Sequence, residues 1–540
     1  HGHFHVVRST HAEGRKTFRH STPGREDGVL MREIIFGPPG TGKTTHLLRI
    51  VEQELKNKVS PSRIGYFAFT TKASEEALKR ATDDFNHDAK DFTYFRTLHS
   101  FAYKELYLKE EDVMNDDDYA FLSNKLQIKL SNPNKKIKSY GAGLPDDVFT
   151  RIIDLAKING ITARGQFDHP DTGHLPGGWL KLDYIERAMQ EYKFGGKYPR
   201  RKYDYTDMLI EFNKKNIDDL PQFDVVIIDE AQDLSWLQWQ MVKRIAEKTK
   251  RLYIAGDDDQ AIFKWAGARP EFLINMKGTR KVLSESFRLP FLIHRKANNL
   301  IRRVRTRVDK EWSARDAQGE INYYPSEQLN KLMQGEWLIL ARNKYNLDLL
   351  EEGLKLEGYY YQRNGSTSVD AKSIRAIRAW EKLRKGGELS LKEVKDVYYY
   401  LMVDRSVNRG HKTMQKADRE KMYDYGTLTK EHGLKVNNNF PWFEAFDSMP
   451  RLKSTYIRAV LRRGQKITHD PRIKLSTIHG AKGGEADNVM LLTDLSKKTD
   501  EAYWLNKDEE RRVFYVGMTR AKQSLNVIRS KSNREFTEVF

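Results

Sequence analysis

A glycine-rich run, GPPGTGKTT from Gly37 onwards, constrains the fold more than any other part of the 540-residue sequence. It matches the pattern G-x-x-x-x-G-K-[ST] and lies between a short apolar segment, EIIF, and a segment with helical periodicity. The glycines let backbone N–H groups close around phosphate oxygens at the positive end of the helix. The run therefore predicts a strand, loop and helix of a parallel α/β sheet with a nucleotide site, in preference to a glycine-rich turn without a ligand.

The residues of this loop have distinct predicted roles. Lys43 is expected to reach the β- and γ-phosphates, and Thr44 to hold Mg²⁺. Backbone groups of the neighbouring residues enclose the phosphates. The predicted nucleotide-binding residues of the loop are Gly37, Gly40, Thr41, Gly42, Lys43, Thr44 and Thr45.

Two acidic residues follow a second apolar segment, in the run VVIIDEAQD. Asp229 is expected to hold the metal ion, and Glu230 is placed to orient or deprotonate an attacking water. Acidic residues after a strand can also cap a helix, but a P-loop in the same chain favours the catalytic interpretation. Together the two runs indicate hydrolysis of a nucleoside triphosphate, and they leave open what the hydrolysis drives.

The composition narrows the class of partner. Lys and Arg number 94 against 75 Asp and Glu, and the formal net charge of +19 favours a polyanion such as nucleic acid over a basic but inert surface. The absence of cysteine excludes disulfides, Cys-ligated zinc and Cys-ligated iron–sulfur clusters, and is typical of a reducing compartment. No apolar run approaches the ~20 residues of a membrane span, so no membrane partner is expected.

Strand-like apolar segments alternate with helical segments in both halves of the chain, which predicts two parallel α/β cores. Charged segments at 105–204 and 367–469 are expected to be inserted, mainly helical subdomains. The cores then comprise 31–104 with 205–280, and 281–366 with 470–540.

Residues 1–30 stand apart from this organisation, because they show no sustained apolar period. We expect a disordered tail or a non-native segment ahead of Met31. A metal site built from His1, His3, His5 and His11 is the alternative.

The segment IAGDDDQAIFKWAGA, residues 254–268, contains both polar and aromatic side chains. Phosphate chemistry needs charges and amides such as those of the DDDQ stretch, but it does not need the aromatic pair Phe263 and Trp265. Aromatic rings stack on nucleic-acid bases of any sequence, at ~1–3 kcal/mol per base. We infer that the second ligand of this segment is a nucleic-acid base.

The same segment closely resembles motif III of the UvrD/Rep/PcrA helicases of superfamily 1A, and the other motifs of that family occur in order. AFTTKAS (68–74) resembles motif Ia, and TLHSF (97–101) resembles motif Ib. YDYTDML (203–209) resembles the segment before motif II, and DEAQD (229–233) resembles motif II itself. Motifs IV, V and VI are resembled by LSESFRLP (283–290), STIHGAKGGEAD (476–487) and EERRVFYVGMTRAK (509–522). The resemblance covers both cores, from Met31 to about Ile528, and does not include the two inserts.

This resemblance implies two RecA-like domains, 1A and 2A, with inserted subdomains 1B and 2B and with ATP between 1A and 2A. It makes Gln260 a sensor of the γ-phosphate, and Arg288 and Arg520 arginine fingers from the second core. It also places Phe287 on the adenine and Glu485 at the ribose. Arginine suits this role because it offers a planar, permanently charged fork to phosphoryl oxygens.

The resemblance further implies a path for single-stranded DNA. The predicted contacts are Phe69, Thr97, His99, Phe263, Trp265 and His479. Core packing or helix capping is the alternative for each of them, with equal weight for Thr97 and His479. On the functional interpretation, one segment carries both the nucleotide sensor and the base-stacking rings.

The sequence departs from the family pattern in several places. Residues 1–36 contain no glutamine, whereas the family usually carries one there that recognises the adenine edge. Ala266 replaces a common Arg, and Gly484 and Ala486 replace the Leu and Phe of motif V, so a DNA or interdomain contact is expected to be weaker. The second insert is also shorter than the usual 2B subdomain.

These features predict an ATP- and Mg²⁺-dependent 3′→5′ DNA helicase and single-stranded DNA translocase, with polarity taken from the resemblance alone. A translocase that strips proteins from DNA without strong unwinding, and an RNA-directed motor, are the alternatives. The expected partners are single-stranded DNA, 3′-tailed duplex DNA and replication or repair proteins. The chain is expected to be monomeric or weakly self-associating, in a bacterial cytoplasm or a virus-infected cell.

Weak discrimination between ATP and GTP is a testable consequence of the missing glutamine. Phe287 can stack on any base, whereas hydrogen bonds to a base edge reject the wrong base by large factors. We expect kcat/KM for GTP to lie within ~10³-fold of the value for ATP in steady-state assays. A larger difference would mean that another residue recognises the base.

Overall fold

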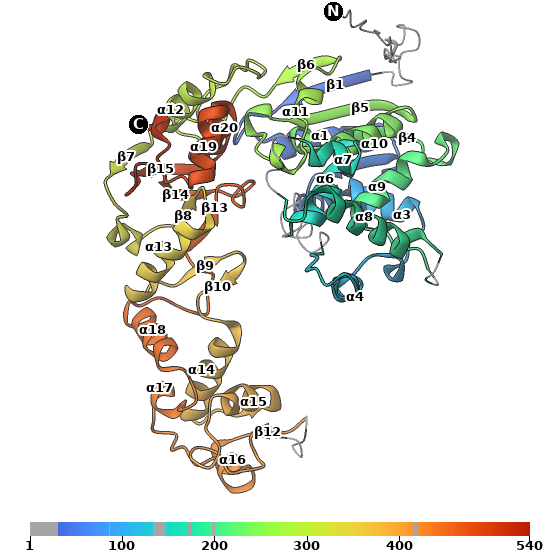
Figure 1. Ribbon diagram of the computed structural model, residues 1–540. Coiled ribbons are helices and arrows are strands. Elements are labelled where there is room, and N and C mark those ends of the chain that lie inside the picture. The colour runs from blue at the N-terminus through green and yellow to red at the C-terminus, as the bar shows by residue number, and fades with distance from the viewer. Residues whose placement is uncertain are drawn as a thin grey trace, which may run out of the picture.

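The computed structural model describes residues 31–85, 87–132, 147–169, 172, 175–196, 198, 200–414, 418 and 420–540. The expected N-terminal tail and the alternative histidine site therefore lie outside the described residues. Two largely parallel sheets flanked by helices confirm the predicted α/β class (Figure 1). Within the described ranges, no helix has both the length and the apolar character to cross a membrane.

The first sheet has six parallel strands in the order β3-β2-β4-β5-β1-β6. Both faces are covered, because Ile34 and Phe36 pack into one hydrophobic cluster and Ile35 into another. The strands are β1 (Met31–Phe36), β2 (Ile64–Ala68), β3 (Phe95–Thr97), β4 (Phe223–Ile228), β5 (Thr249–Gly256) and β6 (Thr279–Val282). Associated helices include α1 (Lys43–Lys56), α2 (Thr71–Phe85), α3 (Leu98–Glu105), α9 (Tyr205–Lys214), α10 (Trp236–Ala246) and α11 (Pro270–Ile274).

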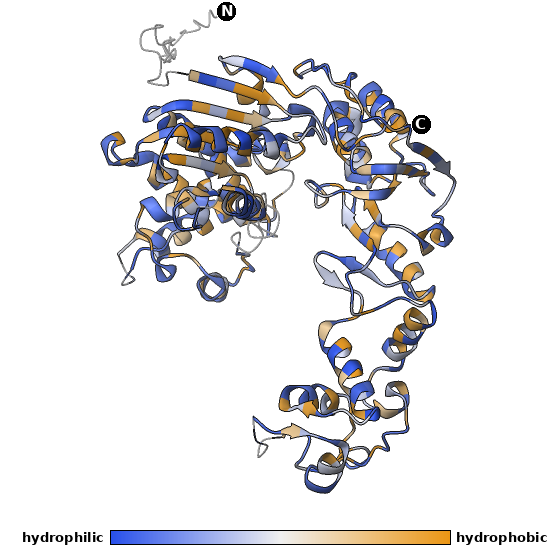
Figure 2. Cartoon of the chain, turned by 180° about the vertical axis from the view of Figure 1, so that it is seen from behind, coloured by the Kyte–Doolittle hydropathy of each residue, from blue (hydrophilic) through white to orange (hydrophobic). Residues whose placement is uncertain are grey.

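The second sheet has seven strands in the order β10-β9-β13-β8-β14-β15-β7, and only the β9–β10 pair is antiparallel. Its strands are β7 (Glu320–Tyr324), β8 (Trp337–Ala341), β9 (Tyr361–Arg363), β10 (Ser366–Thr367), β13 (Ile473–Thr477), β14 (Ala486–Leu492) and β15 (Ala521–Ile528). Associated helices are α12 (Phe291–Ile301), α13 (Lys344–Leu356), α19 (Lys497–Leu505) and α20 (Lys507–Met518). Hydrophobic residues are concentrated in the central strands and on one side of the helices (Figure 2).

Helices dominate the described part of the segment between α3 and α9. They are α4 (Asp116–Leu126), α6 (Val148–Asn159), α7 (Ala163–Phe167) and α8 (Gly178–Phe194), and they share a hydrophobic core of their own. A buried ionic cluster ties this core to α9, because Lys193 contacts Asp204 at 2.7 Å and Asp207 at 2.6 Å. Lys157 contacts the same two carboxylates at 2.9 and 2.7 Å.

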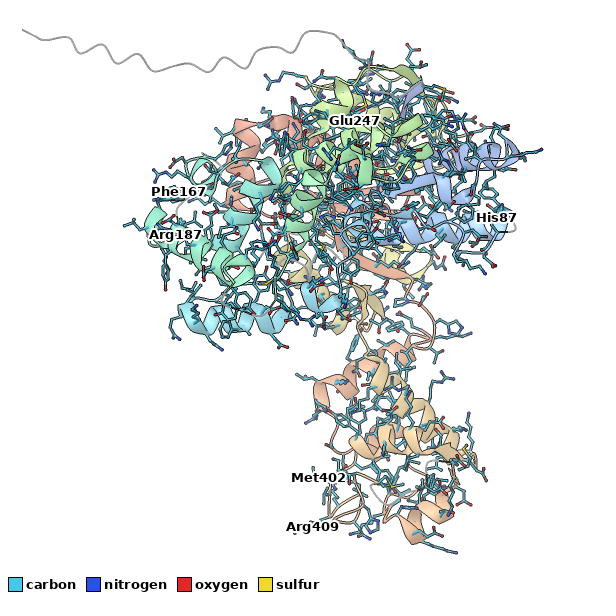
Figure 3. All side chains as sticks on the ribbon, turned by 90° about the vertical axis from the view of Figure 1, so that its right-hand side faces the viewer. His87, Phe167, Arg187, Glu247, Met402 and Arg409 are labelled. Atoms are coloured by element: carbon cyan, nitrogen blue, oxygen red, sulfur yellow. The ribbon has the colours of Figure 1, made fainter. Side chains whose placement is uncertain are left out.

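A second helical segment, with a separate core, lies between β10 and β13. It comprises α14 (Ala371–Arg384), α15 (Leu391–Tyr399), α16 (Tyr425–Glu431), α17 (Trp442–Ala445), α18 (Arg451–Arg462) and a two-stranded pair, β11 (Leu389–Ser390) and β12 (Met422–Tyr423). This segment extends away from the two sheets, and Met402 and Arg409 mark its far end (Figures 1 and 3).

The carboxyl ends of β1, β4 and β5 lie at one edge of the first sheet, because neighbouring parallel strands end on the same side. The loops that follow these strands carry the glycine-rich run, the two acidic residues and the DDDQ stretch. The segment that joins β6 of the first sheet to α12 of the second contacts this same edge, as the hydrogen bond from Phe287 N to Gly40 O at 2.8 Å illustrates. The junction of the two sheets is therefore the candidate site.

Candidate nucleotide and nucleic-acid site

The glycine-rich loop has the backbone shape that an anion site requires. Gly40 and Gly42 adopt left-handed conformations, with φ of 75° and 73°, which favour glycine. Gly42 is the N-cap of α1, and no side chain caps the helix there. The first N–H groups of α1 are therefore available to phosphate oxygens.

Lys43 lies between the two predicted catalytic acids. Its Nζ is 3.1 Å from Asp229 Oδ1, and it also donates a hydrogen bond to Glu230 Oε1. Burial opposes charge on both partners, but the ion pairing raises the pKa of Lys43 and, with help from Lys482, lowers the pKa of Glu230 to about 2. Lys43 and Glu230 are therefore both ionised at neutral pH.

Oxygen ligands suited to Mg²⁺ are present at this point. Asp229 is 3% exposed, and its second oxygen accepts a hydrogen bond of 3.0 Å from Tyr66. Thr44, in the first turn of α1, offers a hydroxyl. Among the described residues, no group of three or more His, Asp or Glu side chains could hold a metal ion. This donor set fits Mg²⁺, which in nucleotide sites takes one or two protein ligands and completes its shell with phosphates and water.

The segment between β6 and α12 packs directly on the glycine-rich loop. Ser286, which is fully buried, donates a hydrogen bond of 2.8 Å to Pro39 O. A Cβ atom at Gly40 would lie 2.4 Å from Arg288 Cβ, so only glycine allows this approach. Phe287 is 71% exposed, and its ring lies 3.5 Å from the position that a Cβ of Gly42 would take. Its open face suits the stacking of a base.

The two predicted arginine fingers differ in their environment. Arg288 pairs with Glu485 at 2.6 Å, and Glu485 also pairs with Lys522 at 3.0 Å. Arg520 is 2% exposed, and its side chain donates only to neutral acceptors, including Gln260 Oε1 at 2.8 Å. None of the ion pairs found within the described residues includes Arg520. Burial and repulsion from Arg288 lower the pKa of Arg520 to about 9, so this guanidinium is charged and suited to an added anion.

Lys482 also belongs to this site, although it is not among the residues predicted from the sequence. It pairs with Asp233, donates 2.7 Å to Gln260 O and lies 4.0 Å from Glu230. The available signal was its place within the motif V resemblance, in STIHGAKGGEAD. Lys482 connects the second sheet domain to the acids that follow β4 and to the segment that follows β5.

The aromatic residues of the predicted DNA path form one cluster. Phe69 stacks on Phe263 with ring centroids 6.0 Å apart, and His479 lies 6.0 Å from Phe263 and 6.1 Å from Trp265. Trp265 is 49% exposed. Phe263 was expected to face the nucleic acid, but it is only 5% exposed and belongs to the hydrophobic core. Its ring instead packs against the exposed ring of Trp265.

Two other predicted DNA contacts lie at α3. Thr97 is the N-cap of this helix, and its hydroxyl accepts a hydrogen bond of 3.2 Å from Ser100 N, which is the capping role weighed as the alternative. The ring of His99 lies 5.9 Å from that of Tyr205.

The histidines of the path are neutral at physiological pH. Burial lowers the pKa of His99 to about 4. Burial, together with the charges of Arg342 and Lys482, lowers the pKa of His479 to about 3. Any contact that they make with a nucleic acid would use hydrogen bonding or stacking and not positive charge.

Family comparisons agree with this geometry. The model of the UvrD/REP helicase N-terminal domain matches residues 31–281, and that of the UvrD-like helicase C-terminal domain matches residues 473–528. A probable DNA helicase II homolog of Mycoplasma genitalium is 24% identical over 91% of this chain and 82% of its own length. DNA helicase II of Haemophilus influenzae is 23% identical over 94% of this chain and 83% of its own length.

Among solved structures, the PRRSV helicase aligns with 93% of this chain, at 11% identity and a TM-score of 0.32, and this chain spans about half (53%) of that chain. Arginines from the second half of the chain lie beside the P-loop and beside Gln260, which is the arrangement of a two-domain nucleotide-binding protein. The chain belongs to the UvrD/Rep family of superfamily 1 helicases, which are ATP-dependent DNA helicases.

Neutral buried histidines make the free energy of unfolding depend on pH. Unfolded chains bind protons at histidine near pH 6.5, whereas the folded protein binds them at His99 and His479 only near pH 4 and pH 3. Because the unfolded state then binds more protons, the free energy of unfolding should fall as the pH drops below about 6.5.

Urea unfolding at pH 7.5 and pH 5 measures this effect. His479→Asn should lose less free energy of unfolding over that interval than the wild type, because Asn cannot bind the proton. His469→Asn, at an exposed position, is the control and should behave as the wild type. Equal losses in all three proteins would contradict the assignment.

Proposed function

We propose that this protein is an ATP-driven motor that moves 3′→5′ along single-stranded DNA and unwinds 3′-tailed duplex DNA. The support comes from its family and from the position of the exposed Trp265 ring on the segment that also carries Gln260. In this proposal the segments 105–204 and 367–469 act as subdomains 1B and 2B, between the halves of domains 1A and 2A.

ATP is held between the two sheets in this mechanism. The N–H groups of the Gly37–Thr45 loop and Lys43 bind the phosphates, and the base stacks on Phe287. Lys43 exchanges its carboxylate partners for phosphate oxygens, which frees Glu230 to accept a proton from the attacking water. Thr44 and Asp229 would hold Mg²⁺, which when bound supplies charge neutralisation at the β- and γ-phosphates.

Closure of the two domains brings the second set of charges to the γ-phosphate. Arg520 and Arg288 stabilise negative charge on the transferred group, and Lys482 supports the acids from the same side. Glu485, now paired with Arg288, releases it when the ribose and phosphates arrive. Delivery of Arg520 by the second domain makes hydrolysis depend on closure.

One observation carries the proposal that this cycle moves DNA. The short segment after β5 contacts Arg520 through Gln260 and, five residues on, presents the half-exposed ring of Trp265. A change at the nucleotide is therefore transmitted to a base-stacking surface through a segment that is anchored in the core by Phe263.

Strand displacement on duplexes with a 3′ or a 5′ single-stranded tail tests the proposal. We expect ATP-dependent unwinding of the 3′-tailed duplex and little of the 5′-tailed one. Glu230→Gln is the matched control, because it keeps the size of the side chain and removes the carboxylate, so ATP should bind while unwinding is lost. Unwinding of only the 5′-tailed substrate would show that the polarity is 5′→3′. ATPase activity that RNA stimulates and DNA does not would show that the substrate is RNA.

Trp265→Ala tests the stacking surface. Loss of one stacked base costs ~1–3 kcal/mol, so affinity for short single-stranded DNA should fall roughly 5- to 150-fold while basal ATPase persists. Phe263→Ala is the comparison, because truncation of a buried ring should cost ~3–5 kcal/mol of stability. Melting temperature, basal ATPase and oligonucleotide affinity are measured on each preparation. A large drop in melting temperature with parallel loss of ATPase in Trp265→Ala would contradict the stacking role.

A further inference from the structure

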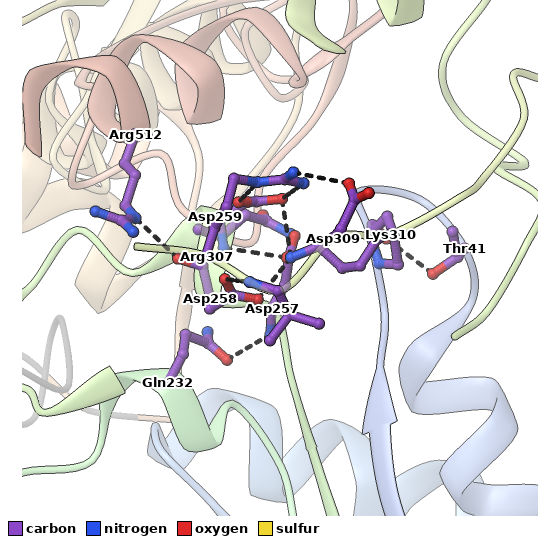
Figure 4. Close-up of polar contacts among 12 residues, drawn as sticks. Thr41, Gln232, Asp257, Asp258, Asp259, Arg307, Asp309, Lys310 and Arg512 are labelled. Atoms are coloured by element: carbon purple, nitrogen blue, oxygen red, sulfur yellow. Dashed lines mark hydrogen bonds and ion pairs between the residues drawn. The ribbon is translucent and has the colours of Figure 1, made fainter. Parts of the chain in front are cut away.

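Three consecutive aspartates after β5 form a buried ionic cluster (Figure 4). Asp257, Asp258 and Asp259 are each at most 1% exposed. Lys310 lies 2.9, 2.6 and 2.8 Å from their carboxylates, in that order, and Arg307 donates two hydrogen bonds of 2.8 Å to Asp259. Buried carboxylates are tolerated because these partners compensate them, so the geometry of the cluster is strongly constrained.

The compensating groups come from the second half of the chain. Lys310 and Arg307 lie in the loop that follows α12, and Val308 N of the same loop donates 2.8 Å to Asp258 Oδ2. Arg512 of α20 donates 3.0 Å to Asp258 O. The segment that carries Gln260 is therefore fixed at its start by groups from beyond the first sheet.

Asp257 makes a specific contact with the carboxamide of Gln260. Gln260 Nε2 donates 2.8 Å to Asp257 Oδ2, while Gln260 Oε1 accepts 2.8 Å from Arg520. The other oxygen of Asp257 accepts from Lys310 at 2.9 Å and from Asp259 N at 3.2 Å. An ionised carboxylate can only accept hydrogen bonds, and a guanidinium can only donate them. Both neighbours of Gln260 thus demand the same orientation of its amide group.

We propose that Asp257, held by Lys310, is a positioning residue for ATP hydrolysis, because it fixes the carboxamide of Gln260 with its oxygen toward Arg520. The proposal rests on the proposed roles of Gln260 and Arg520 at the γ-phosphate. A flipped amide would place two donors against each other and displace the arginine from its place beside the nucleotide.

Asp257→Asn gives this proposal a directional test. Lys310 and Asp259 N both require an acceptor, so the introduced asparagine keeps its oxygen toward them and turns its NH₂ group toward Gln260. Gln260 must then flip and present its own NH₂ group to Arg520. We expect kcat to fall ~10²-fold, the scale of losing one preorganised donor, with KM for ATP unchanged.

The fold should tolerate this substitution. Within the buried cluster three carboxylates face two cations, Arg307 and Lys310, so the substitution leaves two of each. Thermal unfolding checks that stability is retained. Asp309→Asn is the matched control, because Asp309 contacts Arg307 at 3.1 Å but its side chain is 87% exposed, and its ATPase should equal that of the wild type.

A double-variant cycle with Gln260→Glu separates positioning from a general effect on structure. In Gln260→Glu alone, the introduced carboxylate lies beside that of Asp257, so two acceptors face each other and activity should be strongly impaired. In the variant that combines both substitutions, the introduced asparagine can donate to one oxygen of the introduced glutamate while Arg520 donates to the other. If the two substitutions acted independently, their fold-losses in kcat would multiply. We expect kcat of the double variant to be ~5-fold or more above that multiplied value, as for residues that contact each other.

Each outcome of the cycle has a distinct meaning. Additive losses, or an Asp257→Asn effect confined to KM, would overturn the positioning role. Gln260→Ala separates this result from failure of the proposed function: near-normal ATPase in that variant would show that Gln260 itself has no part in hydrolysis.

Discussion

Burial of charge where the two sheets meet is the constraint on which the rest of the structure depends. Lys43 is compensated by two carboxylates of its own domain, whereas Arg520 is buried with neutral acceptors only. A buried charge without an acidic partner is costly, so the environment of Arg520 favours the binding of an anion. In the proposed mechanism the triphosphate of ATP is that anion, and its binding draws the two domains together.

The parts of this site that sequence reasoning found are those in which local chemistry dictates local structure. A phosphate loop needs glycines at left-handed positions and a helix behind them, and Gly40, Gly42 and α1 satisfy both requirements. The alternation of strands and helices likewise gave the α/β class, because a parallel sheet needs a crossover helix between strands. The family resemblance added Phe287, Arg288 and Arg520, which no local pattern identifies.

The pairing of particular lysines with acids that are distant in the sequence was not foreseeable. Lys310 and Lys482 are single lysines in a chain with 94 basic residues, and their acids lie about fifty to two hundred and fifty positions away. The DDDQ stretch was assigned as a whole to phosphate chemistry, yet its three aspartates bind Lys310 and Arg307, and only Gln260 contacts an arginine finger. The two residues of the aromatic pair also differ in role, because Phe263 lies in the core whereas Trp265 lies at the surface.

The strand order of the second sheet has a consequence for how the chain is made. β8 lies between β13 and β14, and β7 pairs with β15 at the edge of the sheet. The neighbours of β7 and β8 in the sheet are therefore all strands from the last part of the chain. During synthesis both strands leave the ribosome before the whole α14–α18 segment. They have no hydrogen-bonded neighbours in the sheet until residues 473–528 emerge. Exposed strand edges of this kind invite aggregation, and such long-range pairing is slow. The first sheet closes much earlier, so the nascent protein passes through a stage in which one motor domain is folded and the other is an open set of strands.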